Sequence, residues 1–445
     1  MRVILSQPNV KHVEKTSHPH AGLAYLAAYS IKKGHSTTVI DAKYEGITNN
    51  ELLNRIVEWK PDIVGFTIRT PDVREAEKLS IAIKKAIPQC VIVVGGAHVT
   101  GLKERVLEEC RYFDIAVIGE GEETFSELLD ILTKPEFKRE LLHEVNGIIF
   151  QNNGKIVTTD PRSLIQDLDF LPFPAWNMFP KSSTRPLFTS RGCPFKCIFC
   201  QRVMGNKVRS MSPERVLQEM KWNIEQHGCT FFQIEDEVFG VNRKWINRVL
   251  DLMIEQGIHK KVKWFANSRV NIANLELFKK MRNAGCVAIG LGIESGNQEI
   301  LDAIRKDFKL QQAYDAIKMA KQAGLITFAF FILGHPNETK RTIRDTINFA
   351  CKLNPTEVTF GIMIPYPGTE IYEMAKRREG GYKSLDEDWE KFTKHFGKGI
   401  ELEELSSKDL NRYQKQAYLE FYIRNFRIKD FYIFLKRYLR ILTIR

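Results

Sequence analysis

The sequence predicts an α/β protein built from two consecutive units, in which short apolar strands alternate with amphipathic helices. Three observations support this class. The chain has 445 residues, enough for two or three domains, and 43% of them are hydrophobic. Strand and helix patterns alternate over residues 1–130 and again from Pro186 onward. The strands are almost continuously apolar, which is typical of parallel sheets covered by helices on both faces.

The first unit should be a Rossmann-like, or flavodoxin-like, parallel sheet. The expected strands are 2–6, 37–40, 63–67, 91–94 and 115–118, and the expected helices are 21–33, 50–59, 73–86, 103–110 and 123–132. Ligands of such sheets bind at the carboxyl ends of the strands, where glycine lets the backbone approach a bulky ligand. Two glycine-rich turns, at 95–96 and 119–122, fall at such ends.

The second unit should be a partial (βα)6 barrel. Its expected strands are 186–190, 231–235, 263–267, 287–293, 326–333 and 357–362. The spacing of these strands does not by itself exclude other α/β barrels. A small hairpin at 146–158 and a proline-stiffened stretch should link the units. The expected domains are 1–135 (the sheet domain), 136–180 (a linker subdomain), 181–385 (the barrel) and 386–445 (a helical segment).

Three cysteines with the spacing C-x3-C-x2-C, Cys193, Cys197 and Cys200, follow the first strand of the second unit. Three thiolates on one loop can hold three irons of a [4Fe–4S] cluster and leave the fourth iron open to another ligand. A structural zinc ion usually takes four ligands, and the next candidates, His227 and Cys229, lie too far along the chain to complete a pair. Cysteines without a ligand, or a disulfide, would also be compatible with the spacing. The cluster would lie at the carboxyl face, where barrels place active sites.

This cysteine run resembles that of the radical S-adenosylmethionine (SAM) enzymes, and the resemblance covers about 186–375. It extends to segments that end successive strands, at 235–237, 267–270, 290–296, 333–339 and 365–370. The resemblance implies the following SAM contacts: Phe199 beside the adenine, Glu235 and Asp236 near the sulfonium or ammonium group, Arg269 on a carboxylate, and Glu294 with Ser295. Two residues stay open. His335 suits a turn that caps its own backbone as well as a proton donor. Lys306 could reach the site, although a solvated lysine is the default.

The first unit resembles the cobalamin-binding domain that often precedes a radical SAM domain. The similar segments are 22–28, 33–35 with Asp41, 93–100 and 118–122. The implied cobalamin contacts are Arg69, Thr70, Gly95, Gly96, Gly119, Glu120 and Gly121. A flavin or a nucleotide is the alternative ligand for this fold.

Many cobalamin domains carry a D-x-H-x-x-G motif whose histidine ligates cobalt from below. When its glycine is aligned with Gly22, Ser17 and Pro19 occupy the Asp and His positions, and His18 and His20 only flank them. The resemblance therefore implies a cobalt without a protein imidazole below it. The loop after the third strand would then face that lower side, although an ordinary loop is equally compatible.

The net charge of +12 is concentrated at the end of the chain. Residues 421–445 carry seven Lys or Arg and one Asp, hence 7 − 1 = +6, interleaved with aromatic residues. Such a helix could pack on the domain with a solvated basic face, or could lie on an anionic membrane surface. Nucleic-acid binding is the least favoured option.

Together the two resemblances imply a cobalamin-dependent radical SAM enzyme of the class B methyltransferase type, with a [4Fe–4S] cluster, SAM and cobalamin as cofactors. The commonest reaction of such enzymes is C-methylation of an unactivated carbon through a 5′-deoxyadenosyl radical and methylcobalamin. We expect a small-molecule or lipid substrate and an external one-electron reductant of the flavodoxin or ferredoxin type.

Three different functions share parts of this pattern. A related enzyme could cyclise, oxidise or rearrange its substrate without methyl transfer. A methylthiotransferase would need a second cluster, for which the N-terminal region has only Cys90 and Cys110. A cobalamin- or redox-sensing regulator belongs to a different class. The polar start of the chain and the lack of an apolar window of roughly 18 residues favour a cytoplasmic protein, with peripheral membrane contact as an option.

Overall fold

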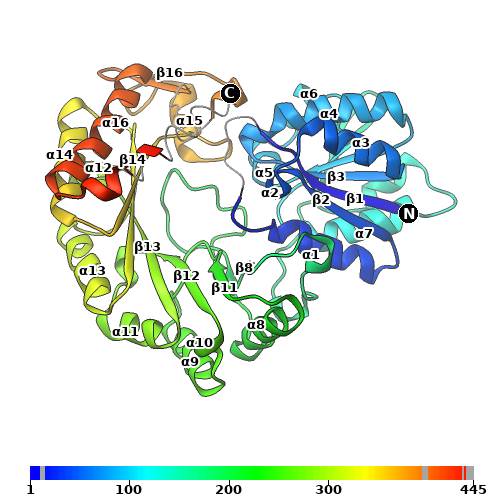
Figure 1. Cartoon of the computed structure of the whole chain (residues 1–445). Coiled ribbons are helices and arrows are strands. Elements are labelled where there is room, and N and C mark those ends of the chain that lie inside the picture. Colours follow the sequence, from blue (N-terminus) through cyan, green and yellow to red (C-terminus); the bar gives the residue numbers. More distant parts are fainter. Residues whose placement is uncertain (11–15, 393–398, 433–434, 437–445) are drawn as a thin grey trace. The chain divides into compact units, whose positions relative to one another are not determined.

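The structure is a computed structural model, and it describes residues 1–10, 16–392, 399–432 and 435–436. The chain divides into two compact units (Figure 1). The first comprises Met1–Ser182 with Val203–Gly205, and the second comprises Ser183–Arg202 with Asn206–Arg445. In the parts of the chain that are described, no helix is both long enough and apolar enough to cross a membrane.

The first unit is built on a seven-stranded sheet with the order β2-β1-β3-β4-β5-β6-β7. Its strands are β1 (Arg2–Gln7), β2 (Ser36–Asp41), β3 (Ile63–Thr67), β4 (Val91–Gly95), β5 (Ile115–Val117), β6 (Ile148–Asn152) and β7 (Lys155–Thr158). Strands β1 to β5 are parallel and have the flavodoxin-like order, which confirms the predicted fold class. The hairpin β6–β7 does not form a separate linker body, because β6 pairs antiparallel with β5 and extends the same sheet.

Helices connect the parallel strands of this unit. In its described residues they are α1 (Ala21–Lys32), α2 (Ala42–Glu45), α3 (Asn49–Trp59), α4 (Val73–Ala86), α5 (Ala97–Leu102), α6 (Arg105–Glu109) and α7 (Glu122–Leu132). One boundary was predicted wrongly. The expected helix 103–110 is only α6, and α5 precedes it because Lys103 adopts a left-handed φ of 57° that interrupts the helical path.

The second unit is built on a six-stranded parallel sheet with the order β15-β14-β13-β12-β11-β8, as expected for a partial barrel. Its strands are β8 (Thr184–Leu187), β11 (Phe231–Ile234), β12 (Lys263–Ser268), β13 (Cys286–Glu294), β14 (Ile326–Leu333) and β15 (Glu357–Ile362). Along β11, β14 and β15 buried and half-buried side chains alternate. One face of the sheet is therefore sealed, and the other lines an open lumen.

Helices cover the sealed face, as Figure 1 shows for α9, α11 and α13. In its described residues, the labelled helices of the second unit are α8 (Pro213–His227), α9 (Arg243–Glu255), α10 (Ile258–Lys261), α11 (Leu275–Asn283), α12 (Gln298–Ala303), α13 (Leu310–Gln322), α14 (Lys340–Leu353), α15 (Glu370–Arg377) and α16 (Ser407–Arg424), and residues 428–432 are helical as well. Ser212 accepts a hydrogen bond from the Arg215 N–H and Pro213 opens α8, so this helix begins where the capping signal predicts.

Smaller elements complete both units. Two short antiparallel pairs join β9 (Ser190–Arg191) to β10 (Arg209–Ser210) and β16 (Tyr382–Leu385) to β17 (Ile400–Leu402). The 3-10 helices are η1 (Thr70–Asp72), η2 (Arg139–Glu144), η3 (Leu168–Phe170), η4 (Trp176–Met178), η5 (Val270–Ile272) and η6 (Trp389–Lys391).

The C-terminal segment is only partly helical. In the described residues 386–392 and 399–402, η6 and β17 occur where helices were expected, and α16 follows. Gln414 and Tyr418 of α16 hydrogen-bond the backbone of Phe360, so this helix packs on β15. Residues 437–445, the end of the basic and aromatic segment, lie outside the described residues.

Candidate active site

The cysteine loop is fastened by its backbone to several parts of the second unit. The Gly192 N–H donates to Glu237 Oε2 at 3.0 Å, and the Ile198 N–H donates to the Ile304 carbonyl at 3.4 Å. The Ile198 carbonyl accepts from the Ile371 N–H at 3.2 Å. A loop held in this way presents its three thiols in a fixed arrangement.

Asp236 anchors the strand that leads into this loop. Its carboxylate accepts four hydrogen bonds of 2.5 to 3.0 Å from the backbone N–H and hydroxyl groups of Thr189 and Ser190. Burial raises the pKa of Asp236 to about 6. Since both oxygens are already occupied, Asp236 is better suited to holding the loop than to contacting SAM.

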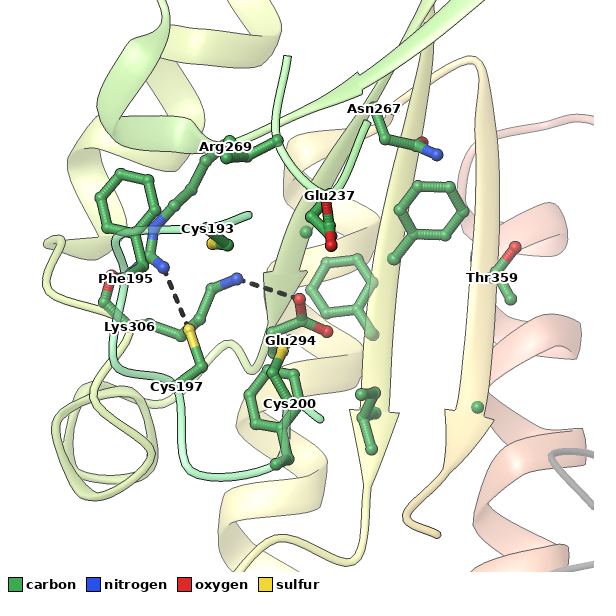
Figure 2. A pocket seen from close by; sticks show the side chains of 18 of the residues that line it. Cys193, Phe195, Cys197, Cys200, Glu237, Asn267, Arg269, Glu294, Lys306 and Thr359 are labelled. Atoms are coloured by element: carbon green, nitrogen blue, oxygen red, sulfur yellow. Dashed lines mark hydrogen bonds and ion pairs between the residues drawn. The ribbon is translucent and has the colours of Figure 1, made fainter. Parts of the chain in front are cut away.

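The three thiols line one cavity of about 520 Å³ (Figure 2). All three cysteines are free; Cys197 is buried, Cys193 is half-buried and Cys200 is exposed. Interaction with the Cys200 thiol and the nearby charges of Lys306 and Arg269 lower the pKa of Cys197 below its usual value. The same interaction raises the pKa of Cys200, and burial raises that of Cys193.

Arg269 contacts this thiol directly. Its Nη1 lies 3.0 Å from Cys197 Sγ, and its guanidinium carbon lies 3.9 Å from the ring centroid of Phe195. Nε donates to Asn271 Oδ1, and Nη2 donates to the Lys306 carbonyl. The sequence placed Arg269 on a carboxylate of SAM; in the structure its partners are a cysteine, an amide and a carbonyl.

Lys306 is not the solvated lysine that the sequence favoured. It is buried, and its Nζ lies 3.0 Å from Glu294 Oε1, also buried (Figure 2). Its Nζ lies 5.9 Å from the centroid of the Phe199 ring, which lines the same cavity. Sequence reasoning named Lys306 as able to reach the site but did not predict the ion pair, because Glu294 ends β13 and Lys306 follows α12, and only folding brings them together.

The backbone around Glu294 is unusual. Glu294 has a φ of 71°, and the pairing of β13 with β14 shifts between Gly292 and Glu294. This irregularity turns the carboxylate toward Lys306. An added Cβ at Gly292 would overlap Glu294 Oε1 and lie 3.2 Å from Lys306 Nζ, so a larger residue there would displace this pair.

His335 hydrogen-bonds the backbone of Glu294 from outside the cavity. It is fully buried, is not among the residues that line the cavity, and its Nε2 donates to the Glu294 carbonyl at 3.4 Å. Burial lowers the pKa of its imidazole to about 3, so the ring is neutral. Of the two roles left open by the sequence, the geometry favours the structural one.

Other positions differ in their relation to the cavity. Ser295 is buried against Thr346 Oγ1 at 3.1 Å, and neither Ser295 nor Glu235 lines the cavity. Glu237 and Asn267, from segments that the sequence singled out, also line the cavity, and so do Phe330, Thr359 and Gly361, which sequence reasoning missed. Four of these lie at half-buried positions of the strands β12, β14 and β15. The period-two pattern could have identified them as lumen-facing.

In the first unit, the expected cobalamin contacts lie at the ends of parallel strands or just beyond them. Thr70 is buried, and its hydroxyl lies 3.2 Å from His98 Nδ1. The half-exposed Arg69 pairs with the buried Asp72 through Nε and Oδ2 at 2.9 Å. Gly96 has a φ of 106°, and a Cβ there would lie 2.8 Å from the Ile68 carbonyl oxygen.

The second glycine-rich turn, 119–121, adjoins α7. The Gly119 N–H donates to Thr100 Oγ1 at 3.0 Å, and a Cβ at Gly121 would lie 3.4 Å from Leu26 Cδ2. The buried Glu120 accepts from the Ile165 N–H at 2.8 Å and so ties the turn to the segment after β7. Gly95 ends β4.

His18 and His20, which flank the position of the D-x-H-x-x-G histidine, each contact backbone atoms of neighbouring residues. His20 caps α1, with Nδ1 accepting from the Leu23 N–H at 3.2 Å, and burial lowers its pKa to about 4. His18 Nδ1 lies 3.2 Å from the Pro19 carbonyl.

The residues of the second unit fit an iron–sulfur cluster with SAM. Three free thiols share one cavity, whose volume lies within the range of small-ligand sites. In the described ranges, no three His, Cys, Asp or Glu side chains converge on a single point, as one metal ion would require. The thiolates of a cubane each bind a different iron, so they need no common point.

Comparison with known proteins assigns the chain to a class. A model of the Radical SAM superfamily matches residues 187–350, and a model of the B12 binding domain matches residues 9–129. An uncharacterized methyltransferase of Pyrococcus horikoshii is 34% identical over 440 residues, which cover 95% of this chain and 93% of that protein. The chain therefore belongs to the radical SAM superfamily, and it is a cobalamin-dependent radical SAM enzyme.

One further relative and one solved structure are also similar to this chain. An anaerobic magnesium-protoporphyrin IX monomethyl ester cyclase of Cereibacter sphaeroides is 32% identical over 389 residues, 84% of this chain and 63% of that protein. The radical SAM methyltransferase TsrM of Kitasatospora setae, solved with cobalamin and a [4Fe–4S] cluster bound, superimposes with a TM-score of 0.75. It is 16% identical over 95% of this chain and 88% of that chain, so it shows the shared fold.

Proposed function

We propose that this protein transfers a methyl group from SAM to an unactivated carbon of a small molecule. The observation that carries the proposal is the three-thiol cavity with its Glu294–Lys306 pair, in a chain that also has a B12-binding domain. The similarity to a protein named as a methyltransferase, over nearly the whole of both chains, supports methyl transfer.

The bound cofactors would supply radical generation from SAM and a methyl carrier. Cys193, Cys197 and Cys200 would hold the cluster. Glu294 would accept from the ammonium group of SAM, and Lys306 would donate to its carboxylate, since the two groups have complementary charges. The half-buried Phe199 would pack beside the adenine.

We propose that the first unit holds cobalamin at the carboxyl ends of its strands. The Gly95-Gly96 turn and the turn 119–121 would allow the corrin to approach the backbone. The Arg69–Asp72 pair and Thr70 would lie toward its lower side, where no histidine motif is present.

A second candidate is a reaction without methyl transfer, because the cyclase of Cereibacter sphaeroides is almost as similar as the methyltransferase. Product analysis separates the two. The full chain is reconstituted with iron, sulfide and cobalamin and is incubated with a one-electron reductant, candidate substrates and SAM that carries a deuterated methyl group. Methyl transfer yields S-adenosylhomocysteine, 5′-deoxyadenosine and a labelled product. 5′-Deoxyadenosine with an unlabelled product indicates the second candidate, and the absence of 5′-deoxyadenosine contradicts both.

We propose that the electron comes from an external flavodoxin or ferredoxin. The five cysteines outside the loop, Cys90, Cys110, Cys229, Cys286 and Cys351, are all buried and scattered, which gives no support to a second cluster. Free thiols throughout the chain also favour the reducing cytoplasm.

Contact with an anionic membrane, and hence a lipid substrate, is supported by side chains after α16. Phe426, Ile428 and Tyr432 are 91%, 76% and 57% exposed, and Lys429 and Lys436 lie among them in the sequence. Sedimentation with phosphatidylglycerol vesicles tests this. The Phe426→Ser, Ile428→Ser double variant should lose binding, whereas Phe170→Ser, at a 62% exposed site of the first unit, should not. Equal binding by all three proteins would exclude this contact.

A further inference from the structure

We propose that Arg269 is a positioning residue that donates a charge-assisted hydrogen bond to the Cys197 thiolate in the assembled cluster, and that it thereby raises the reduction potential of the cluster. The proposal rests on the cluster of the proposed function. It replaces the expectation that Arg269 pairs with a carboxylate of SAM.

The contact between the two groups is short and shielded from water. Arg269 Nη1 lies 3.0 Å from Cys197 Sγ, and both residues are buried (Figure 2). Hydrogen bonds between charged partners are stronger than neutral ones, and they strengthen further where water is excluded. Cys197 is one of the three proposed cluster ligands, so this bond would reach the cluster itself.

The guanidinium is held on all sides. Its other nitrogens donate to Asn271 Oδ1 at 3.0 Å and to the Lys306 carbonyl, and one face stacks on Phe195. Because these contacts fix the plane of the group, Nη1 stays directed at the sulfur. A planar fork that must satisfy three separate acceptors is a geometry that arginine provides and lysine does not.

The charge of Arg269 also requires an anion. The residue is only 5% exposed, and among the described residues no carboxylate lies within ion-pair distance of it. By contrast Lys306, in the same cavity, is paired with Glu294. A buried cation without an anionic partner is costly. In the assembled cluster, the Cys197 thiolate would be that anion.

A cation that donates to a ligand sulfur should favour the reduced cluster. Reduction adds one negative charge, and hydrogen bonds to the sulfurs are among the features that set cluster potentials. The bond falls on one thiolate of the three.

The test measures the midpoint potential of the reconstituted full-length protein by a redox titration followed by electron paramagnetic resonance, without SAM or substrate. Arg269→Gln should shift the midpoint to a more negative potential, and Arg269→Lys should shift it less. Arg305→Gln is the matched control. The Arg305 side chain, in a neighbouring loop, is 49% exposed and paired with Glu370. Its removal should leave the midpoint potential unchanged.

Iron and sulfide content is measured for every variant. If Arg269→Gln does not fold or load, Asn271→Ala decides the question, because it frees Nε while keeping the guanidinium, and a smaller negative shift is expected. An unchanged midpoint in a fully loaded variant, or an equal shift in Arg305→Gln, overturns the proposal. A wild-type protein that binds no four-iron cluster would instead overturn the proposed function.

Discussion

At the scale of single residues, the Glu294–Lys306 pair is the part of the site whose disruption should lower the free energy of unfolding most. Both side chains are buried, so each depends on the other for compensation of its charge. Removing one partner of a buried pair typically costs about 3–5 kcal/mol, whereas replacing both by neutral groups costs much less. The pair is therefore a stability element of the apoprotein as well as a candidate SAM contact.

Lys306→Met should lower the free energy of unfolding of the apoprotein by about 3 kcal/mol, because it leaves the Glu294 carboxylate buried and unpaired. The Lys306→Met, Glu294→Gln double variant should recover a large part of that loss. Urea denaturation followed by circular dichroism measures both. Lys309→Met, at a 69% exposed side chain, should change stability by less than about 0.5 kcal/mol. Single and double variants of equal stability would show that the pair is not coupled.

The buried Glu338 should make the stability of the protein depend on pH. One of its oxygens accepts from the Gly334 and His335 N–H groups, and the other has no partner among the described residues. Burial raises its pKa to about 8 from a usual 4.5. The folded state thus keeps a proton that the unfolded chain releases. The associated stability is fully present below the unfolded pKa and is lost as the pH rises through about 8.

Wild-type stability should accordingly fall between mildly acidic pH and pH 8, by at most about 1.4 kcal/mol per pH unit from this group. Glu338→Gln keeps a neutral acceptor and should flatten the profile. Urea denaturation at several pH values provides the measurement, and a profile as steep as that of the wild type would contradict the assignment.

At the scale of elements, β13 is the strand that forms the site. It lies between β12 and β14, and its lumen-facing positions are glycines at 290 and 292. An added Cβ at Gly290 would lie 2.7 Å from Phe330, so neighbouring side chains occupy the space above the strand. The bulge that follows directs Glu294 into the cavity.

Gly292→Ala should leave the fold intact and weaken SAM binding by about tenfold or more, since it displaces the Glu294–Lys306 pair. Gly361→Ala is the control, because its Cβ would meet nothing closer than the Phe331 carbonyl oxygen at 3.8 Å in the same cavity. Equilibrium dialysis of the cluster-loaded proteins with SAM compares them. Equal affinities would remove Glu294 and Lys306 from the SAM site.

At the scale of the whole molecule, the two units have separate sheets and separate cores. The proposed cluster ligands belong entirely to the second unit, and the proposed cobalamin contacts belong entirely to the first. Loading of one cofactor should therefore not require the other.

The triple variant Cys193→Ala, Cys197→Ala, Cys200→Ala should lose the cluster and still bind cobalamin. Conversely, Gly96→Ala, whose Cβ would press on the Ile68 carbonyl, should weaken cobalamin binding and keep the cluster. Iron and cobalt analysis with optical spectra detects both. If either variant lost both cofactors while remaining folded, independent loading would be refuted.

The sequence by itself determined the class of this protein, because the signals for class are local. Thiol spacing, strand patterning and glycine-rich turns each occupy a few consecutive residues. They predicted both sheets and an iron–sulfur site, and the resemblance of these segments to known families implied SAM and cobalamin. The sequence predicted the hairpin β6–β7 but not its pairing with β5, because an apolar pattern does not specify which sheet edge a strand joins.

Only the tertiary structure decided the partners of the individual charges. Arg269 lies 72 residues from Cys197, Lys306 pairs across a strand end with Glu294, and Asp236 holds two residues more than 40 positions away. Such contacts depend on which loops meet at one edge of the sheet and on which groups lose water there. A buried charge pairs with whichever group the folded chain places beside it, and a local sequence pattern does not specify that group.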